Sequence, residues 1–319
     1  MITALILAAS LSGAVSAAPS CNPEQIAALT ALSETPYRLT CSTRLAPDQP
    51  IRRRLVLEGP QSSNVTLDCN GGSIGHPDTT VSASAPTVMI RSEKSAGGQW
   101  LPTSGITVRN CHVFGAVRVW GMGADGSYDD LRLSSHQAGH TERLQAVAPR
   151  HIRLEQVRIT ARGTIPLYVG PGVTRLTLED STLDGTSTAT AVYLDAESAD
   201  NTLRNNRILT RTGREMIAID GSARNTISGN RFDLHGQPGI YLYRNCGERG
   251  VIRHQTPSDN IIENNSFTGA AWLRPRLVVE NARNGRRSYC GADRGYPFGS
   301  SLDDRDNATG NTVRNNRKP

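Results

Sequence analysis

Tyrosines, arginines and a histidine cluster around residues 239–254, where their types suit proton transfer beside an anionic group. Residues 239–250 read GIYLYRNCGERG, and Arg253 and His254 follow closely. Removing a proton α to a carboxylate requires a cation that neutralises the carboxylate and a base that reaches the carbon-bound hydrogen. The candidates are Arg244 or Arg253 as the cation, His254 or Tyr243 as the base, and Tyr241 as the acid that protonates a leaving oxygen. This set predicts β-elimination, or C5 epimerisation if the proton returns on the other face.

Carboxylates and tyrosines also recur at matching positions of short apolar segments, which predicts two columns on one sheet face. The segments can be aligned by their aliphatic residues; they are PLYVG, AVYLD, MIAID, GIYLY and RLVVE. In a strand with this alignment, every second side chain points outward. The first column holds Tyr168, Tyr193, Ala218, Tyr241 and Val278, and the second holds Gly170, Asp195, Asp220, Tyr243 and Glu280. If the earlier AVRVW has the same register, it adds Arg118 and Trp120. Aromatic rings beside carboxylates are typical of sugar-binding surfaces, which makes Tyr193, Tyr241, Glu215 and Glu280 candidate substrate-binding residues.

Asp195 and Asp220 form the closest predicted carboxylate pair. Adjacent strands lie about 4.8 Å apart, so two charges there would raise the pKa of one carboxyl group. The pair is either catalytic or neutralised by a cation such as Arg214 or Arg244. It suits a retaining glycoside hydrolase, and Asp220 with Glu280 borders on the wider spacing of an inverting one. The two aspartates are also possible calcium ligands, although no other metal or cofactor is indicated.

The positive charge of the chain is local. The chain has a formal net charge of +6, and residues 243–254 and 274–294 together carry the same net charge. These two segments follow candidate strands as insertions, at about 244–258 and 281–308. Because arginine binds carboxylates in a bidentate manner, the excess favours an acidic polysaccharide as the partner. Nucleic acid is disfavoured because the chain lacks an aromatic-rich groove for single strands.

A repeat of about 24 residues must position these side chains. NTLRNN at Asn201 recurs as NTISGN at Asn225, NIIENN at Asn260 and NTVRNN at Asn311, with insertions in the last two intervals. Each unit holds short alternating segments and no helical period, so units must stack to bury a face. Stacking predicts amide ladders, and one of them aligns Asn206, Asn230, Asn265 and Asn316.

The repeat resembles that of the right-handed parallel β-helix proteins, which include pectate lyases, polygalacturonases, alginate epimerases and lyases, and NosD-like proteins. The resemblance implies an all-β fold over residues 61–319 and does not identify an enzyme subfamily. Two interpretations therefore stand beside the lyase or epimerase: a glycoside hydrolase, and a non-catalytic module that binds polysaccharide. A NosD-like metal function would need a His, Met or Cys cluster, which the sequence lacks.

The N-terminal region is predicted to contain a signal peptide and a cap. Residues 1–18 are uncharged and apolar with a small-residue cleavage site, which indicates export to the periplasm or beyond. Residues 19–60 would cap the coil, beginning with a helix that has Asn22 as N-cap, Pro23 in the first turn and Gln25 at the capping-box position. No later segment is long enough to span a membrane. We expect a monomer.

All six cysteines follow the predicted cleavage point, and an even number in an exported chain favours disulfides. Counting alone leaves fifteen pairings open. The predicted cap, coil positions and insertions favour the pairs Cys21–Cys41, Cys69–Cys111 and Cys246–Cys290.

Overall fold

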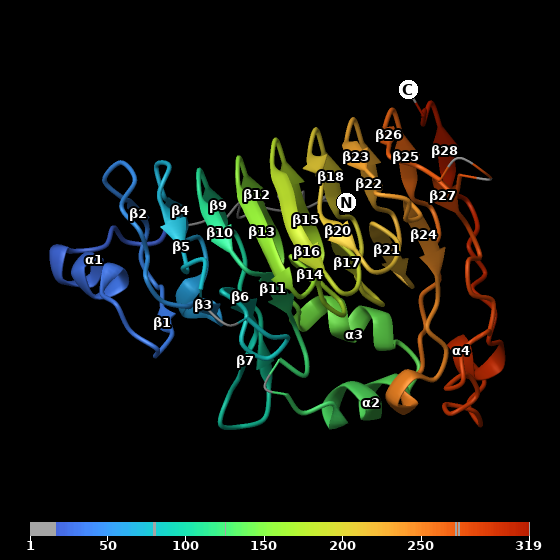
Figure 1. Ribbon diagram of the computed structural model, residues 1–319. Helices are drawn as coiled ribbons and strands as arrows, with labels where there is room; N and C mark the ends of the chain where they lie inside the picture. Colours follow the sequence, from blue (N-terminus) through green and yellow to red (C-terminus); the bar gives the residue numbers. More distant parts are fainter. Residues whose placement is uncertain (1–16, 79–80, 125, 272, 274, 319) are drawn as a thin grey trace, which may run out of the picture.

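The protein is a right-handed parallel β-helix built from three long parallel sheets (Figure 1). This computed structural model describes residues 17–78, 81–124, 126–271, 273 and 275–318. The predicted signal peptide, residues 1–18, therefore falls almost wholly outside the described residues. Most coils contribute one strand to each sheet, and neighbouring coils pair in parallel. The predicted fold class is thus confirmed.

The first sheet, which carries the candidate columns, contains nine parallel strands. Its strands in spatial order are β1 (Tyr37–Arg38), β3 (Leu55–Glu58), β6 (Val88–Arg91), β11 (Val117–Trp120), β14 (Leu167–Val169), β17 (Val192–Leu194), β21 (Ile217–Asp220), β24 (Ile240–Tyr243) and β27 (Val278–Val279). We call it the site sheet.

The other two long sheets complete each coil. One contains β2 (Thr43–Arg44), β4 (Thr66–Asp68), β9 (Thr107–Arg109), β12 (Arg150–Glu155), β15 (Thr174–Glu179), β18 (Thr202–Arg204), β22 (Thr226–Ser228), β25 (Ile261–Glu263) and β28 (Thr312–Arg314). The other contains β5 (Ser73–Ile74), β10 (His112–Phe114), β13 (Arg158–Gly163), β16 (Thr182–Ser187), β19 (Arg207–Ile208), β20 (Arg211–Thr212), β23 (Arg231–Asp233) and β26 (Ser266–Thr268). A separate antiparallel pair joins β7 (Glu93–Lys94) to β8 (Trp100–Leu101).

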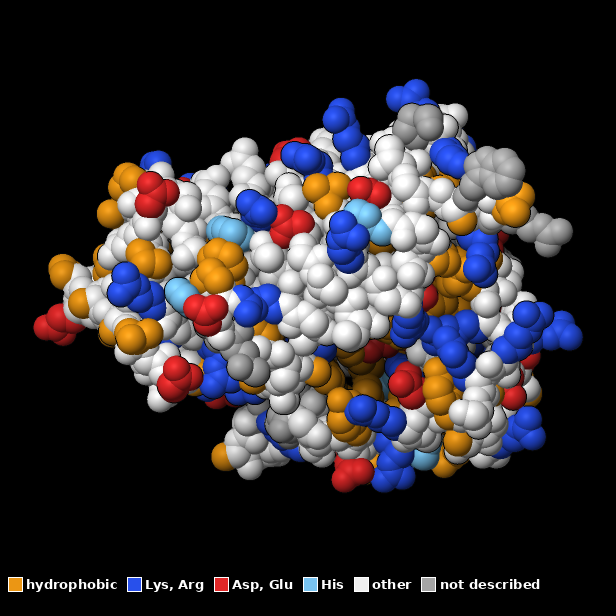
Figure 2. Space-filling model, viewed as in Figure 1, with side chains coloured by type: hydrophobic (Ala, Val, Ile, Leu, Met, Phe, Trp, Pro, Cys, Tyr) orange, Lys and Arg blue, Asp and Glu red, His pale blue; other side chains and the backbone are white. Residues whose placement is uncertain are grey.

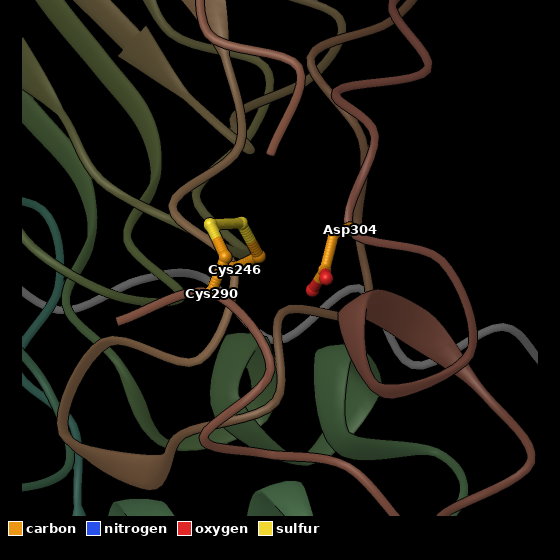
Figure 3. Close-up of side chains that lie close together, drawn as sticks. All are labelled: Cys246, Cys290 and Asp304. Carbon is orange, nitrogen blue, oxygen red and sulfur yellow. A yellow bond between two sulfur atoms is a disulfide. The ribbon is translucent and has the colours of Figure 1, made fainter. Parts of the chain in front are cut away.

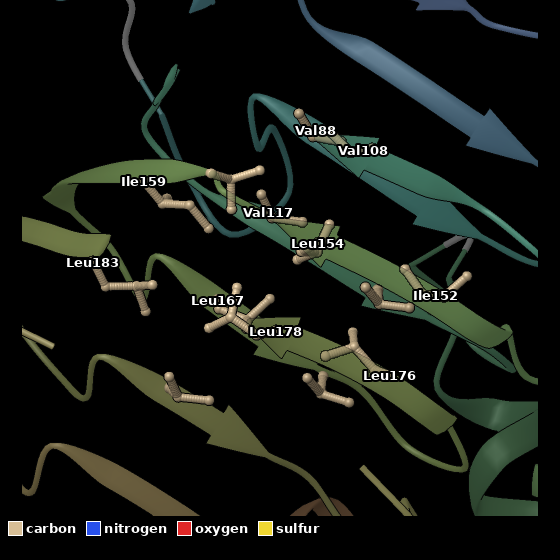
Figure 4. Close-up of a cluster of buried hydrophobic side chains, with 14 of the residues drawn as sticks. Val88, Val108, Val117, Ile152, Leu154, Ile159, Leu167, Leu176, Leu178 and Leu183 are labelled. Atoms are coloured by element: carbon tan, nitrogen blue, oxygen red, sulfur yellow. The ribbon is translucent and has the colours of Figure 1, made fainter. Parts of the chain in front are cut away.

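The core is a stack of aliphatic side chains enclosed by the three sheets (Figure 4). Val117, Leu167, Val192, Ile217 and Ile240 occupy paired positions of successive strands in the site sheet, and all are buried. Phe232 and Phe267 stack in the same core with ring centroids 4.6 Å apart. Alternation along each strand therefore sends the intervening residues to the outer face, as the columns require.

Two asparagine ladders run along the turns. In the Asn206 ladder (Asn206, Asn230, Asn265 and Asn316), each side-chain amide donates to the next at 2.9–3.0 Å. A parallel ladder joins Asn201, Asn225, Asn260 and Asn311 in the same way. The ladders also accept backbone N–H groups from the preceding coil, so they satisfy buried donors at every turn. The structural role predicted for these residues is confirmed.

The N-terminal end of the coil is covered by α1 (Pro23–Thr30) (Figure 1). The Asn22 side chain accepts from Gln25 N, and the Gln25 side chain accepts from Asn22 N, as the predicted capping box requires. Leu29 is buried against the core. Within residues 19–60, β1 and β2 already pair in parallel with β3 and β4. A short 3-10 helix, η1 (Pro60–Ser62), follows β3.

Three insertions gather on the outer side of the site sheet. Residues 121–149 leave the coil between β11 and β12 and form α2 (Asp129–Ser135) and α3 (His140–Val147), which the repeat did not predict. The two predicted insertions add η2 (Glu248–Gly250) and α4 (Gly299–Leu302). Figure 1 shows α2, α3 and α4 along one side of the coil. Leu131, Leu144 and Val251 form a small buried cluster that ties the helices to the second insertion.

The disulfides pair as predicted. Cys21 bonds to Cys41, Cys69 to Cys111, and Cys246 to Cys290, which leaves no free cysteine in the described part of the chain. The last bond joins the two later insertions. Asp306 joins them again, since one carboxylate oxygen accepts from Arg244 N and the other from Arg283 N.

Candidate functional site

A cleft of about 470 Å³ lies between the outer face of the site sheet and the insertions. The sheet supplies Arg118, Trp120, Tyr168, Tyr193 and Asp195, while α2 and the insertions supply the facing wall. Figure 2 shows the surface hollowed below the coil, with Lys and Arg side chains along the rim. The described lining includes six arginines and two carboxylates; the arginines are Arg118, Arg214, Arg249, Arg253, Arg283 and Arg287, and the carboxylates are Asp195 and Glu248. The cleft is therefore electropositive, as the charge pattern predicted.

Asp195 is the predicted carboxylate that reaches this cleft. Its side chain accepts a hydrogen bond from the Tyr168 hydroxyl and another from Ala196 N at 2.8 Å. Arg253 Nη1 lies 3.7 Å from the oxygen that accepts from Ala196 N. Tyr168 and Tyr193 stack beside it with ring centroids 5.7 Å apart. Asp195, Arg253 and Tyr193 are thus brought together as the columns and the charge pattern predicted.

Asp220 lies one coil further on but does not line the cleft. It is 0% exposed and accepts from Tyr193 Oη at 2.6 Å and from the backbone and side chain of Asn245 at 2.8 and 2.7 Å. Burial raises the pKa of Asp220 to about 7, and the negative charge of Asp195 also raises it, whereas Arg253 lowers it. The predicted pKa shift is present, although burial is its main cause. The cation beside the pair is Arg253, not Arg214 or Arg244.

The raised pKa of Asp220 gives a pH dependence to stability. Because the folded-state pKa exceeds the ordinary value of 3.8, this group stabilises the fold most below about pH 4, and we expect that contribution to be lost as the pH rises to about 7. Denaturant unfolding of the wild type and Asp220→Asn across this range measures it. The stability of the wild type relative to the variant should fall with rising pH. A constant difference would show that Asp220 does not titrate there.

Tyr243 and Glu215 lie under the insertions rather than in the cleft. Tyr243 is 0% exposed, its hydroxyl donates to Glu215 at 3.1 Å, and Arg283 covers its ring at 3.5 Å. Burial raises the pKa of Tyr243 well above its ordinary value. Glu215 also pairs with Arg214 at 2.6 Å. Neither side chain is among those that line the cleft.

Arg244 has a structural role in place of the predicted neutralising one. It is 2% exposed, and its guanidinium donates to the backbone carbonyls of Asp303 and Arg305. It therefore holds the third insertion against the second. Sequence could not distinguish it from Arg253, because both follow β24 within one insertion.

His254 also lies outside the cleft. Its Nε2 bonds to the Ser135 carbonyl at 2.7 Å, and its ring contacts His140 and Phe298. The buried carboxylate of Glu197 accepts from His254 N at 2.7 Å. This packing fixes α2 against the second insertion, so His254 is not placed to be a base.

Tyr241 and Glu280 do not line the cleft, and the strand before Glu280 also differs from its predicted register. Tyr241 pairs with Val279, not with Val278 as aligned, so Glu280 leaves the predicted column and is exposed. The cause is the run of three aliphatic residues in RLVVE, which satisfies either register. Tyr241 lies beside Arg276, whose guanidinium is 6.0 Å from the ring centroid. Neither residue is among those that line the cleft.

Several residues of the cleft were not singled out in the sequence, because contacts between distant parts of the chain bring them there. Asn245 reaches from the second insertion to Asp220, and its side-chain oxygen accepts from Tyr289 Oη at 2.9 Å. Glu248 accepts from Asn245 Nδ2 at 3.2 Å and lies 3.4 Å from Arg253 Nη2. Tyr128 on the approach to α2 lies under the guanidinium of Arg249 at 4.1 Å. For Asn245, Glu248 and Tyr289 the signal in the sequence was only their place in charged insertions, and Tyr128 had no such signal.

A family model of the right-handed β-helix region matches residues 99–318. The chain belongs to this β-helix family. No curated protein matches it in sequence. Among solved structures, the β-helix protein is similar to the native GH136 lacto-N-biosidase from Eubacterium ramulus, with 10% identity and a TM-score of 0.46 over 86% of this chain and 46% of that one. This chain thus spans less than half of that protein.

The mannuronan C-5 epimerase AlgE4 A-module of Azotobacter vinelandii is also similar, with 13% identity and a TM-score of 0.30 over 90% of this chain and 86% of that one. Neither similarity assigns a substrate or a residue role to the β-helix protein.

No calcium site is assigned to the aspartates, because Asp195 and Asp220 already accept hydrogen bonds from protein groups on both carboxylate oxygens. One cluster of potential metal ligands occurs in the described regions, at Cys246, Cys290 and Asp304 (Figure 3). Its two sulfur atoms are bonded to each other, so they are not available as thiolates.

Three disulfides in the β-helix protein are typical of an oxidising compartment. None of the helices within the described ranges is long and apolar enough to cross a membrane.

Proposed function

We propose that the β-helix protein is an exported carbohydrate-active enzyme that binds an acidic, uronate-containing glycan in the cleft and acts by β-elimination or C5 epimerisation. The observation that carries the proposal is the Asp195 carboxylate bonded to the Tyr168 hydroxyl within an arginine-rich cleft. A carboxylate next to a hydroxyl can pass a proton between two substrate atoms, and the surrounding arginines favour an anionic ligand.

In the proposed elimination, Asp195 and Tyr168 each have one role. Asp195 takes the proton from C5 of the uronate, the C4–O bond breaks, and the electron pair left at C5 forms the C4–C5 double bond. Tyr168 gives its hydroxyl proton to the leaving oxygen and regains one from Asp195. Burial and the charge of Asp195 raise the pKa of Tyr168 well above its ordinary value, so only a strongly basic alkoxide would take this proton. In epimerisation, the C4–O bond stays intact, a second proton is delivered to C5 from the opposite face, and Asp195 releases the proton that it removed to water.

The stacked rings suit a sugar ligand. Trp120 and Tyr168 have ring centroids 5.4 Å apart, and Tyr193 continues the row. Aromatic faces pack against the C–H faces of pyranose rings, while the arginines bind carboxylates. This combination favours an acidic sugar over a neutral one.

Hydrolysis is the second candidate, because the cleft has two carboxylates. Asp195 and Glu248 lie on the two sides of the Arg253 guanidinium, at 3.7 and 3.4 Å from its terminal nitrogens. Paired carboxylates on opposite sides of a glycosidic bond are the requirement for that reaction. The pair differs from the one that the sequence suggested, since Asp220 and Glu280 do not reach the cleft.

One assay separates these functions. The mature protein is incubated with uronate polymers and neutral glycans, while ultraviolet absorbance of unsaturated ends, reducing sugar and sugar configuration by NMR are followed. We expect unsaturated products or a changed configuration from a uronate polymer. Reducing sugar without unsaturation would establish hydrolysis, and binding without any change would establish a non-catalytic module.

A further inference from the structure

Arg118 differs from the other five arginines of the cleft in combining burial with the lack of a partner for its charge. Arg253 lies between Asp195 and Glu248, and Arg214 is paired with Glu215. Arg283 donates to Asn245 Oδ1 and covers the Tyr243 ring. Arg249 and Arg287 are exposed to water. Arg118 is 6% exposed, and its side chain has no hydrogen bond or ion pair with any residue in the described ranges.

The burial of Arg118 is costly without a ligand. Its Nε is fully buried and has no hydrogen-bond acceptor among the described residues, and its guanidinium stacks over the Tyr168 ring at 4.6 Å. Desolvation by burial lowers the pKa of Arg118, which reflects the cost of holding this cation away from water. Buried charges in proteins are ordinarily paired, so the arrangement is incomplete until an anion enters the cleft.

The surroundings of Arg118 place that anion beside the proposed proton-transfer pair. Arg118 and Tyr168 are partners in adjacent strands, and the hydroxyl of Tyr168 bonds to Asp195. Gly170 follows β14, in the coil between Trp120 and Asp195. A Cβ there would lie 2.8 Å from the Val119 carbonyl and 3.2 Å from Tyr168 Cε1, so the position requires glycine.

We propose that Arg118 is the subsite for the carboxylate of the uronate ring that reacts at Asp195. This assignment rests on the proposed function for the acidic glycan. The planar guanidinium fits a carboxylate in bidentate geometry. Neutralising that carboxylate also makes the neighbouring C5 proton easier to remove, so Arg118 contributes to both selectivity and rate.

Binding measurements test this subsite without depending on turnover. Calorimetry compares trigalacturonate and trimannuronate with their methyl esters, which keep the shape and remove the charge. We expect Arg118→Met to weaken binding of the acid forms by about 10- to 100-fold and to leave binding of the esters nearly unchanged. Arg118→Lys should restore part of the loss, because it keeps the charge but not the planar fork. Arg276→Met, outside the cleft, is the matched control and should bind as the wild type does.

The outcomes are distinct. The subsite would be overturned if Arg118→Met and Arg118→Lys weakened binding of the acid and ester forms equally, or weakened binding of neither. It would also be overturned if the wild type bound no uronate. Tighter binding of a sulfated neutral trisaccharide than of either uronate would overturn the assignment to a carboxylate. If the wild type binds uronates through Arg118 and converts none of them, the subsite stands and the proposed chemistry fails.

Discussion

Replacing Asp195 with asparagine is expected to reduce turnover of a uronate substrate by about 10²- to 10⁴-fold, which is the usual contribution of a general base. Asparagine keeps the size of the side chain and can still accept from the Tyr168 hydroxyl. Arg253 would retain Glu248 and the Asn245 carbonyl as partners. The fold and the affinity for the glycan should therefore change little. Steady-state kinetics, with thermal unfolding as a check on folding, measures the effect.

The matched control for Asp195→Asn is Glu280→Gln, the same chemical change at an exposed carboxylate. Because Glu280 has left the column that contains Asp195, its replacement should leave turnover within about twofold of the wild type, as surface changes usually do. Turnover that is unaffected by Asp195→Asn would remove Asp195 from the mechanism. A large loss in Glu280→Gln would mean that the cleft is not the site of reaction.

Replacing Asn230 with alanine is expected to lower the free energy of unfolding by about 2–4 kcal/mol. The backbone N–H of Asn206 would lose the acceptor that now lies 2.9 Å away, and the Leu203 carbonyl would lose a donor at 2.9 Å. Both lie inside the turn of a coil, where water does not replace the missing partner. Chemical denaturation of the purified variant measures the loss.

Asn316→Ala removes the same side chain at the open end of the ladder. Asn316 accepts from Asn265 N and Nδ2, but it is only half-buried, so water can replace it. We expect less than half of the effect of Asn230→Ala. Equal losses at the two positions would show that access to water does not reduce the contribution of the ladder at its end.

The fold could be predicted because its determinants are periodic. Each coil repeats one pattern of inward aliphatics and turn asparagines, and stacking places equal positions above one another. The helices in residues 121–149 could not be predicted in this way. Leu131 in α2 and Leu144 in α3 are the large apolar residues buried there, which is too few to give a helical period.

Part of the candidate site followed from the same periodicity. The column of Arg118, Tyr168, Tyr193 and Ala218 has the predicted register. The alignment failed at Val278, where consecutive aliphatic residues give no preferred register and an insertion separates the strand from the preceding coil. Charge counting predicted the electropositive region but not which arginines would reach the cleft.

The sequence by itself determined the coil and the face on which the candidate site lies, because these depend on repeated local patterns. Only the tertiary structure decided which side chains on that face remain accessible. The insertions fold over the far end of the site sheet, bury Asp220 and Tyr243, and use Arg244 to hold a loop. They leave Asp195 open to the cleft, and Arg118 has no partner for its charge among the described residues. Such differences arise from contacts between residues far apart in the chain, which a repeat period does not encode.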